Sequence, residues 1–453
     1  MKKDLLLVVM AAIFLLSLLA IVRPPEIITG QEAYYHLFAV QHEGTRLTVN
    51  EGPIVYSQYD YILEVAFHLF DPVVFMKIFP ILLGGLSVLL FYFIIKKFVK
   101  EESAIYSSIV FVLSPTFLYL FSTNSAEMVP FVLVLGGILM LISKNHYLSY
   151  LSLIPFIFAS LNSIFVAIIV FGIYFTHYLI KKEKRPDFLV STVIIAGIVI
   201  SQQPRFMLDY VLNNLDLAAN LFSDFGGPWG ISIFTAIFAF AGLIVTKKRE
   251  YFYPLIILLI ISFFIDFKTL IYSNIAICGF AGIGLKRIID KGWKLKNLKH
   301  TMNFLLICGL LFSTISHIGI ITSLGPSTEM VEAAKWLEKN SERDSVIFTS
   351  VSNSYFIEQI SQRKVMMDPL SAYSQNFDQL LNDSSTIYYS RNLKETEKRL
   401  NKYNVSYILV DQEMIEGEIW TRPKEGLLFL FTNQQKFPIA YKKGGIKIIY
   451  YLK

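Results

Sequence analysis

Charged residues are scarce in this sequence of 453 residues: Asp, Glu, Lys and Arg make up 17%, whereas hydrophobic residues make up 54%. A soluble domain usually carries about a quarter charged residues, so the composition excludes an ordinary cytosolic enzyme. Cysteine is nearly absent as well. The two cysteines, Cys278 and Cys308, lie inside apolar runs, which excludes a disulfide framework and a cysteine zinc site.

The sequence also lacks the motifs of several common enzyme classes. It contains no phosphate-binding loop, no G-x-G-x-x-G turn and no nucleophile elbow. It has no internal repeat, and the cores of its apolar runs hold almost no ionisable residues, where transporters usually place them. The net charge of +6 does not indicate nucleic acid, because Lys and Arg lie mostly at the ends of apolar runs.

Long apolar runs fill the first two thirds of the chain. Runs of about 18 or more residues have the length that a bilayer core demands of a helix. We predict a polytopic membrane domain of about eleven helices over residues 1–323, whose first helix is not cleaved as a signal peptide because it lacks a small-x-small site. The predicted helices are 4–22, 73–95, 103–121, 125–143, 146–160, 163–181, 187–203, 228–247, 250–266, 268–286 and 301–323.

Lys and Arg concentrate in alternate loops, among them 96–100, 181–185 and 286–299. Cytoplasmic loops carry an excess of these residues, so the N-terminus is predicted to be cytoplasmic. An odd number of helices then places everything after Leu324 outside, together with a long first loop, 23–72. The sequence thus predicts an integral protein of the plasma membrane.

The composition changes at about Gly325, where charged and amide residues become common and apolar runs shorten. We predict an extracytoplasmic α/β domain over 324–453, which is long enough to form its own core. Its predicted elements are helices over 328–340, 353–362 and 393–403, strands over 345–350, 364–367 and 405–410, and a hairpin around Gly444-Gly445.

Candidate functional residues lie in the predicted outer loops. Glu32-Ala33-Tyr34-Tyr35-His36 follows the first membrane helix. Because the residues after Glu32 look helical, Glu32 suits three roles: a solvated loop charge, a first-turn acid that favours the helix dipole, or a base or metal ligand in a cleft.

Two further candidates have similar alternatives. Glu127 lies where a predicted helix starts, so it is either a first-turn acid or a partner of Glu32 across one outer cleft, where both could hold a divalent cation. Lys268 lies at the outer end of a predicted helix. There it either snorkels to the membrane interface or contacts a lipid-linked phosphate.

In this order the segments resemble a GT-C membrane glycosyltransferase, in particular the catalytic subunit of archaeal oligosaccharyltransferase. That family carries an acidic D-x-Y-Y-H-type motif in its first outer loop, similar to Glu32–Leu37. Its exported domain begins with an Ala-x-x-Trp-Leu helix, similar to Ala333–Leu337. Further similar segments are Ser114-Pro115, Ser122–Glu127, Phe225-Gly226-Gly227 and Tyr355–Glu358 followed by Arg363 and Asp368.

The resemblance implies transfer of a sugar or oligosaccharide from a polyprenyl phosphate or diphosphate to a glycan or protein acceptor at the outer membrane face, with inversion. Glu32 would be the catalytic carboxylate. Glu32 and Glu127 would hold Mn²⁺ or Mg²⁺ if the enzyme uses a metal. By the same resemblance, Lys268 and Arg205 would bind the donor phosphate. Tyr34, Tyr35 and His36 would line the substrate cleft.

The acceptor side departs from the family. Its W-W-D-Y-G motif, which grips the Ser or Thr of an acceptor sequon, would fall on Ser350-Val351-Ser352-Asn353-Ser354, which has no Trp and no Asp. Phe38 also replaces the Arg that usually follows the first motif. Two alternatives therefore stay open: a divergent oligosaccharyltransferase acting on protein asparagine, and an inactive GT-C scaffold or lipid-binding subunit.

The predicted orientation can be tested on intact cells. A protease added outside should cut within residues 325–453, because this segment is predicted to follow the last membrane helix on the outer side. Immunoblotting for a C-terminal tag measures the cut. Protection of the segment would contradict both the orientation and an outward-facing site.

Overall fold

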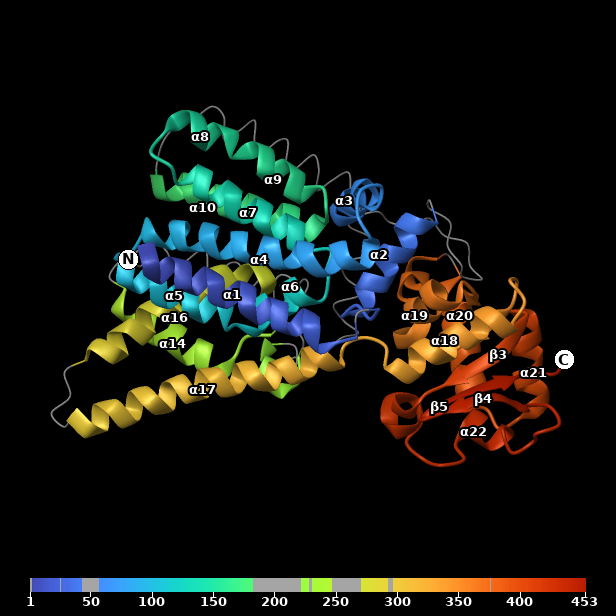
Figure 1. Ribbon diagram of the computed structural model, residues 1–453. Coiled ribbons are helices and arrows are strands. Elements are labelled where there is room, and N and C mark those ends of the chain that lie inside the picture. The colour runs from blue at the N-terminus through green and yellow to red at the C-terminus, as the bar shows by residue number, and fades with distance from the viewer. Residues whose placement is uncertain are drawn as a thin grey trace. The chain divides into compact units, whose positions relative to one another are not determined.

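The computed structural model of the protein describes residues 2–24, 26–42, 57–181, 221–227, 230–246, 270–291, 296–374 and 376–453. They form two compact units (Figure 1). Unit 1 holds residues 1–30, 57–59 and 73–324, and unit 2 holds residues 31–56, 60–72 and 325–453.

Unit 1 is helical. Three stretches in the described residues are long and apolar enough to cross a membrane: Lys3–Val22, Pro72–Lys96 and Lys299–Asn340. The first two correspond to α1 (Lys2–Val22) and α4 (Pro72–Lys96), and the third covers most of α17 (Lys296–Ser323) and continues into the first residues of unit 2. A fourth span results if α5 (Glu101–Val112) and α6 (Pro115–Ser122), bent by 58°, are taken together. The other described helices of unit 1 include α7 (Met128–Leu141), α8 (His146–Leu151), α9 (Leu153–Ser160), α10 (Ile164–Lys181), α14 (Ile233–Val245) and α16 (Leu270–Asp290).

A polytopic helical fold is therefore present, whereas the count of eleven helices stays a prediction. The helices predicted over 187–203 and 250–266 lie outside the described residues. The helix predicted over 103–121 is broken at Ser114-Pro115. Proline has no N–H and cannot continue α5, so it becomes the first residue of α6, where Ser114 Oγ accepts a hydrogen bond from Phe117 N.

Small residues let three membrane helices approach closely. A Cβ added at Gly242 of α14 would lie 1.9 Å from Phe280 O of α16, and one at Gly282 of α16 would lie 2.2 Å from the Cα of Ser107 in α5. The hydroxyl of Ser107 also donates to Gly279 O. Since lipid tails are as apolar as leucine, close packing of small residues is a main source of association between membrane helices. Helix α16 is thus held between α14 and α5 (Figure 1).

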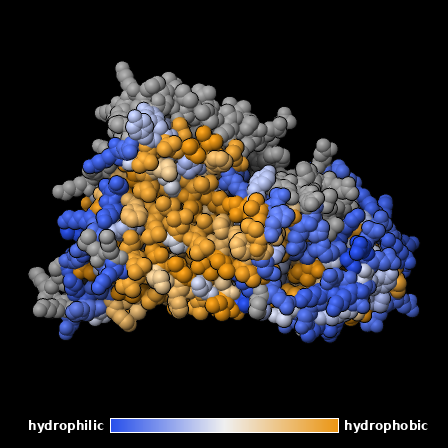
Figure 2. All heavy atoms as spheres, turned by 45° about the horizontal axis from the view of Figure 1, so that its top comes forward, coloured by the Kyte–Doolittle hydropathy of each residue, from blue (hydrophilic) through white to orange (hydrophobic). Residues whose placement is uncertain are grey.

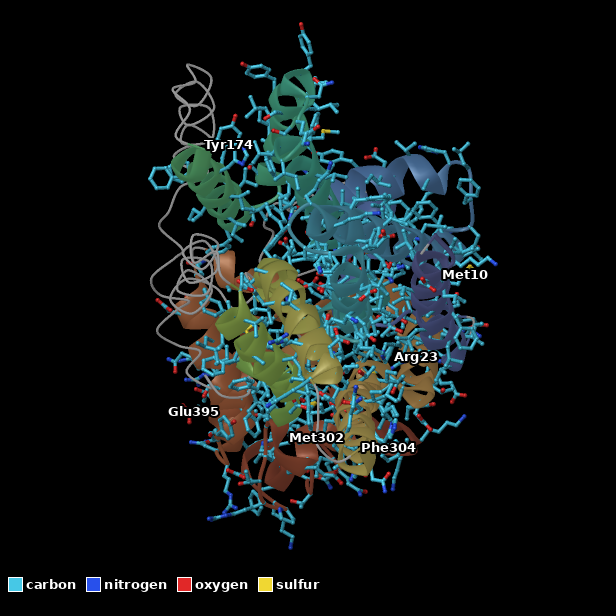
Figure 3. The ribbon with its side chains drawn as sticks, turned by 90° about the vertical axis from the view of Figure 1, so that its left-hand side faces the viewer. Met10, Arg23, Tyr174, Met302, Phe304 and Glu395 are labelled. Atoms are coloured by element: carbon cyan, nitrogen blue, oxygen red, sulfur yellow. The ribbon has the colours of Figure 1, made fainter. Side chains whose placement is uncertain are left out.

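On the face drawn in Figure 2, the surface of unit 1 is apolar over a broad area, whereas that of unit 2 is mostly hydrophilic. Met10 of α1 is 56% exposed and Phe304 of α17 is 66% exposed, and both side chains lie at the outside of their helices (Figure 3). Exposed apolar side chains of this extent mark an interaction surface in a soluble protein. On helices of membrane-spanning length, they suit contact with lipid.

Unit 2 is built on a five-stranded sheet in the order β2-β1-β3-β5-β4. Strand β1 (Val346–Phe348) pairs in parallel with both β2 (Lys364–Val365) and β3 (Val405–Val410). Strand β5 (Ile446–Tyr450) is antiparallel to β3 and to β4 (Ile439–Lys443), with which it forms the predicted hairpin. The strand predicted over 405–410 is confirmed residue for residue.

Helices cover both faces of this sheet. On one face α18 (Thr328–Asn340) and α19 (Val351–Ser361) pack on Ile347 and Leu409. On the other face α20 (Phe377–Tyr389), α21 (Leu393–Lys402) and α22 (Gly426–Leu430) pack on Phe348 and Ile408. The remaining elements of unit 2 include α2 (Gln31–Gln41), most of α3 (Gln58–Phe67), and the turns η5 (Pro369–Tyr373) and η6 (Met414–Glu418).

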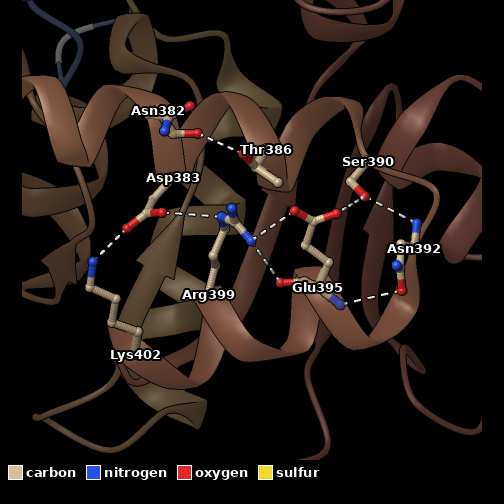
Figure 4. Close-up of polar contacts among 8 residues, drawn as sticks. All are labelled: Asn382, Asp383, Thr386, Ser390, Asn392, Glu395, Arg399 and Lys402. Atoms are coloured by element: carbon tan, nitrogen blue, oxygen red, sulfur yellow. Dashed lines mark hydrogen bonds and ion pairs between the residues drawn. The ribbon is translucent and has the colours of Figure 1, made fainter.

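One carboxylate joins α20 to α21. Asp383 Oδ1 lies 3.1 Å from Arg399 Nε, and Oδ2 lies 2.6 Å from Lys402 Nζ (Figure 4). Oδ2 also accepts a hydrogen bond from Tyr403 OH at 2.8 Å. Burial alone would raise the pKa of Asp383. The hydrogen bonds from Lys402 and Tyr403, with the attraction of both cations, outweigh burial and hold this pKa below its ordinary value.

Asp383→Asn should therefore loosen α20 and α21 at neutral pH. Because the pKa is lowered in the folded state, the ionised carboxylate stabilises the fold at pH values above the ordinary Asp pKa of about 3.9. This stabilisation is lost as the pH falls through the pKa of the folded state. We expect a loss of about 1–3 kcal/mol at pH 7 and little difference from wild type in strong acid. Hydrogen exchange of the α20 and α21 amides in the full-length protein measures this. The exposed Asp378→Asn on α20 is the control, and equal exchange in both variants would contradict the role of Asp383.

Candidate functional site

Helix α2 carries the Glu-Ala-Tyr-Tyr-His motif, and its first residue binds the start of α19. Gln31 Nε2 donates to Val351 O at 3.0 Å and to Ser352 O at 2.7 Å. Glu32, the next residue, lies partly buried in the first turn of α2. Glu32, the candidate catalytic residue, therefore directly follows a residue that is hydrogen-bonded to Val351 and Ser352. These two residues belong to the segment that corresponds to the W-W-D-Y-G motif.

The two tyrosines of the motif pack on α19. Tyr34, 3% exposed, meets Phe356 edge-on with ring centroids 5.0 Å apart, and Tyr35 lies 5.1 Å from Tyr355. Pairs of this geometry favour one relative orientation of two elements. In the described structure these rings fix α2 on α19, and their predicted role in a substrate cleft stays a prediction.

His36 forms a buried pair with Asp60 of α3. Its Nδ1 lies 2.6 Å from Asp60 Oδ1, and the two residues are 2% and 0% exposed. The predicted site contained His36 but not Asp60, since a separation of 24 residues in the sequence gives no local pattern to detect. The pair therefore binds α2 to α3, while Gln31 binds the start of α2 to α19.

A second polar group lies at the N-terminus of α19. Asn353 Nδ2 donates to Ser350 Oγ at 2.9 Å and to Asp411 Oδ2 at 2.6 Å, and Ser352 Oγ donates to Glu418. Partial loss of water around Glu418 raises its pKa. The hydrogen bond from Ser352 opposes this shift, and the nearby charge of Asp411 adds to it. Asp411 and Glu418 were not among the predicted site residues.

Glu127 joins three segments of unit 1. Its Oε2 accepts a hydrogen bond from Tyr272 OH of α16 at 2.6 Å, and its Oε1 accepts one from Asn162 Nδ2, between α9 and α10, at 3.3 Å. Although Glu127 is the N-cap residue of α7, its side chain makes no capping hydrogen bond to the described start of that helix. Its carboxylate therefore connects helices rather than capping one.

The segment that follows α1 is fixed within unit 1. Gly30 N donates to Leu324 O, and Arg23 donates to Thr322 O, so the chain that leaves α1 is bound to the end of α17. Gly30 has φ +94°, and a Cβ there would lie 2.5 Å from Thr123 O. This position requires glycine, both for its backbone conformation and for its close approach to Thr123.

The described residues do not form the predicted metal site or the predicted phosphate site. Among them, no three His, Cys, Asp or Glu side chains are placed to hold a metal ion. Glu32 belongs to unit 2 and Glu127 to unit 1, so a shared Mn²⁺ or Mg²⁺ stays a prediction. Arg205 and Lys268 lie outside the described residues, and their contact with a donor phosphate stays a prediction too.

Comparison with known proteins identifies the fold. No protein-family model and no curated protein matches the sequence. The oligosaccharyltransferase AglB of Archaeoglobus fulgidus, in complex with an inhibitory peptide and a dolichol-phosphate, is similar at TM-score 0.60 and 12% identity, over 90% of this chain and 69% of that one. The same enzyme in complex with zinc and sulfate is similar at TM-score 0.60 and 14% identity, over 98% of this chain and 73% of that one.

ArnT of Cupriavidus metallidurans, bound to undecaprenyl phosphate, is similar at TM-score 0.57 and 10% identity, over 98% of this chain and 97% of that one. Both neighbours are GT-C membrane glycosyltransferases. The resemblance to this fold drawn from the motifs is confirmed. At these identities the likeness shows the fold alone.

The His36–Asp60 pair makes a prediction about α2. Asp60→Asn removes the charge that His36 faces in a buried site. A buried hydrogen bond to a charged group contributes roughly 1.5–3 kcal/mol, so the amides of α2 should exchange with solvent at least about tenfold faster than in wild type. Glu64→Gln, exposed on the same α3, is the control. If α2 exchanges equally in both variants, the pair does not hold this helix.

Proposed function

We propose that the chain is an integral-membrane glycosyltransferase that transfers a sugar or oligosaccharide from a polyprenyl phosphate or diphosphate to an acceptor, with inversion. The observation that carries the proposal is the GT-C fold together with a carboxylate, Glu32, held by α2 at the start of α19.

The fold supports a lipid-linked donor. Two neighbours with this fold hold dolichol-phosphate and undecaprenyl phosphate, and both of these lipids combine a prenyl tail with a phosphate. The exposed apolar helices of unit 1 suit a protein whose substrate has its tail in the bilayer. We place the protein in the plasma membrane, with the N-terminus cytoplasmic and residues 324–453 outside.

In the proposed reaction Glu32 acts as the base. The acceptor nucleophile attacks the anomeric carbon and loses its proton to the Glu32 carboxylate. The bond between the anomeric carbon and the phosphate oxygen breaks, and the polyprenyl phosphate or diphosphate leaves with the electron pair. Attack from the side opposite the leaving group inverts the anomeric centre, as in other single-displacement sugar transfers.

The leaving phosphate needs positive charge because negative charge develops on it in the transition state. Lys268 and Arg205 are our candidates for this role. The proton transfer itself needs only the Glu32 carboxylate as acceptor, so it is tested by changing this one side chain.

Glu32→Gln tests the proposal. The amide keeps the shape of the side chain but cannot take a proton, and general-base assistance is typically worth about a hundredfold to ten-thousandfold in rate. The variant should fold and insert normally and lose nearly all transfer of radiolabelled sugar from a polyprenyl-phosphate hexose.

Glu329→Gln is the matched control, because Glu329 is also a first-turn glutamate, on α18, and is exposed. It should retain wild-type transfer. Near-normal transfer by Glu32→Gln would remove Glu32 from catalysis. Absence of transfer by the wild type from both monophosphate and diphosphate donors would favour the scaffold alternative.

A further inference from the structure

Two Asn-x-Ser sequences occur in unit 2: Asn382-Asp383-Ser384 and Asn404-Val405-Ser406. An asparagine in this pattern is the acceptor of N-glycosylation in segments that leave the cytoplasm. The pattern is common by chance, so the sequence alone does not distinguish a modified asparagine from an unmodified one. The structure separates the two, because it holds them in different backbone conformations.

A transferase that recognises this pattern contacts the asparagine and the serine hydroxyl together. Both side chains therefore have to be accessible on the same side of the chain. Residues i and i+2 meet this condition in an extended segment, where alternate side chains share one face. They fail it in a helix, where positions two apart do not face each other. The backbone conformation at each sequence thus decides whether it can be recognised.

Asn382 lies within α20, which does not present its pattern as an acceptor. Asn382 itself is exposed, and its carbonyl oxygen accepts a hydrogen bond from Thr386 Oγ1 at 2.8 Å, one turn later (Figure 4). Ser384, two residues on, is only 2% exposed. Between them, Asp383 joins α20 to α21. Reaching the hydroxyl of Ser384 would require unwinding of α20 and loss of the Asp383 contacts.

Asn404 lies outside the helices, in the turn between α21 and β3. It is exposed, and its φ of +54° lies in the left-handed region, which asparagine tolerates better than most residues. Ser406 is half-buried in β3, and its hydroxyl donates back to Asn404 O at 3.4 Å. Val405, between them, is 0% exposed and packs in the core. The serine hydroxyl therefore lies close to the asparagine at the surface, while the middle residue points inward.

We infer that Asn404 is a site of N-glycosylation and that Asn382 is not. The donor is an oligosaccharide on a polyprenyl diphosphate. The side-chain nitrogen of Asn404 forms a bond with the anomeric carbon of the oligosaccharide and gives one proton to a base of the transferase. The bond between that carbon and the phosphate oxygen breaks, and the polyprenyl diphosphate leaves with the electron pair. The inference rests on the proposed placement of residues 324–453 outside the membrane.

The fold accommodates a glycan at this position. Strand pairing of β3 with β1 begins at Val405, so Asn404 precedes the sheet. The backbone N–H of Asn404 donates to Asn401 O at 3.2 Å, which closes the turn without using the side chain. A glycan on the side-chain nitrogen of Asn404 therefore leaves the turn, the sheet and the core contacts of Val405 in place.

Mass spectrometry of the full-length protein, purified from its native membranes, tests the inference. Trypsin separates the two sequences, because it cleaves after Arg391 and Lys402, which lie between them. We expect the peptide with Asn404 to carry a glycan and the peptide with Asn382 to be unmodified. Asn404→Asp, which keeps a residue that tolerates the left-handed turn, should lose the glycan entirely. The matched control Asn382→Gln should leave it unchanged.

Two variants at Ser406 show whether the modification follows the Asn-x-Ser pattern. Ser406→Ala keeps Asn404 but removes the hydroxyl, so the glycan should be lost. Ser406→Thr keeps a hydroxyl on a residue that is favoured in strands, so the glycan should be retained. The inference is overturned if wild-type Asn404 is unmodified, if Asn382 carries a glycan, or if Ser406→Ala is still modified. These measurements do not use sugar transfer by the protein itself, so they are independent of the result for Glu32→Gln.

Discussion

The side-chain amide of Gln31 donates to two backbone carbonyls of α19, and the placement of the candidate carboxylate depends on this contact. It joins residues 320 positions apart in the chain. A carbonyl has two lone pairs, so Val351 and Ser352 accept these bonds without giving up those of their own helix. Beyond this start, Tyr34 and Tyr35 pack on Phe356 and Tyr355 of α19. Glu32 is then held by rigid secondary structure, as precise acid–base chemistry requires.

The local sequence pattern predicted several helices and strands of unit 2, but it did not predict which side chains meet at the candidate site. The helix over 328–340 and the strand over 405–410 have clear apolar periodicity, and both are confirmed. Helix α20 was not predicted, because Phe377–Tyr389 is interrupted by Asn, Asp and Ser, which favour caps and turns in isolation. The partners Asp60 and Asp411 lie 24 and 58 residues from His36 and Asn353. Nothing local identifies them.

In unit 1 apolar composition predicted where helices run but not where polar groups meet. Asp224 lies between the helices predicted over 187–203 and 228–247, yet its Oδ1 accepts a hydrogen bond from Ser313 in α17 and its Oδ2 accepts one from Ile233 N at the start of α14. Glu127 likewise binds Tyr272 of α16. A polar side chain within a helical bundle is retained when neighbouring helices satisfy it. The scarcity of charges in the apolar runs therefore coexists with polar contacts that tie the helices together.

The absence of a W-W-D-Y-G motif is interpreted differently from the structure than from the sequence. From the motif alone, Ser350–Ser354 indicates an acceptor site that has been lost. In the folded chain the same five residues form the start of α19, to which Gln31, the residue before Glu32, is hydrogen-bonded. Asp411 at the end of β3 and Glu418 in η6 accept hydrogen bonds from Asn353 and Ser352. Under the proposed function, the missing motif therefore leaves a polar, hydrogen-bonded start of α19 at the ends of the parallel strands, where a ligand is expected.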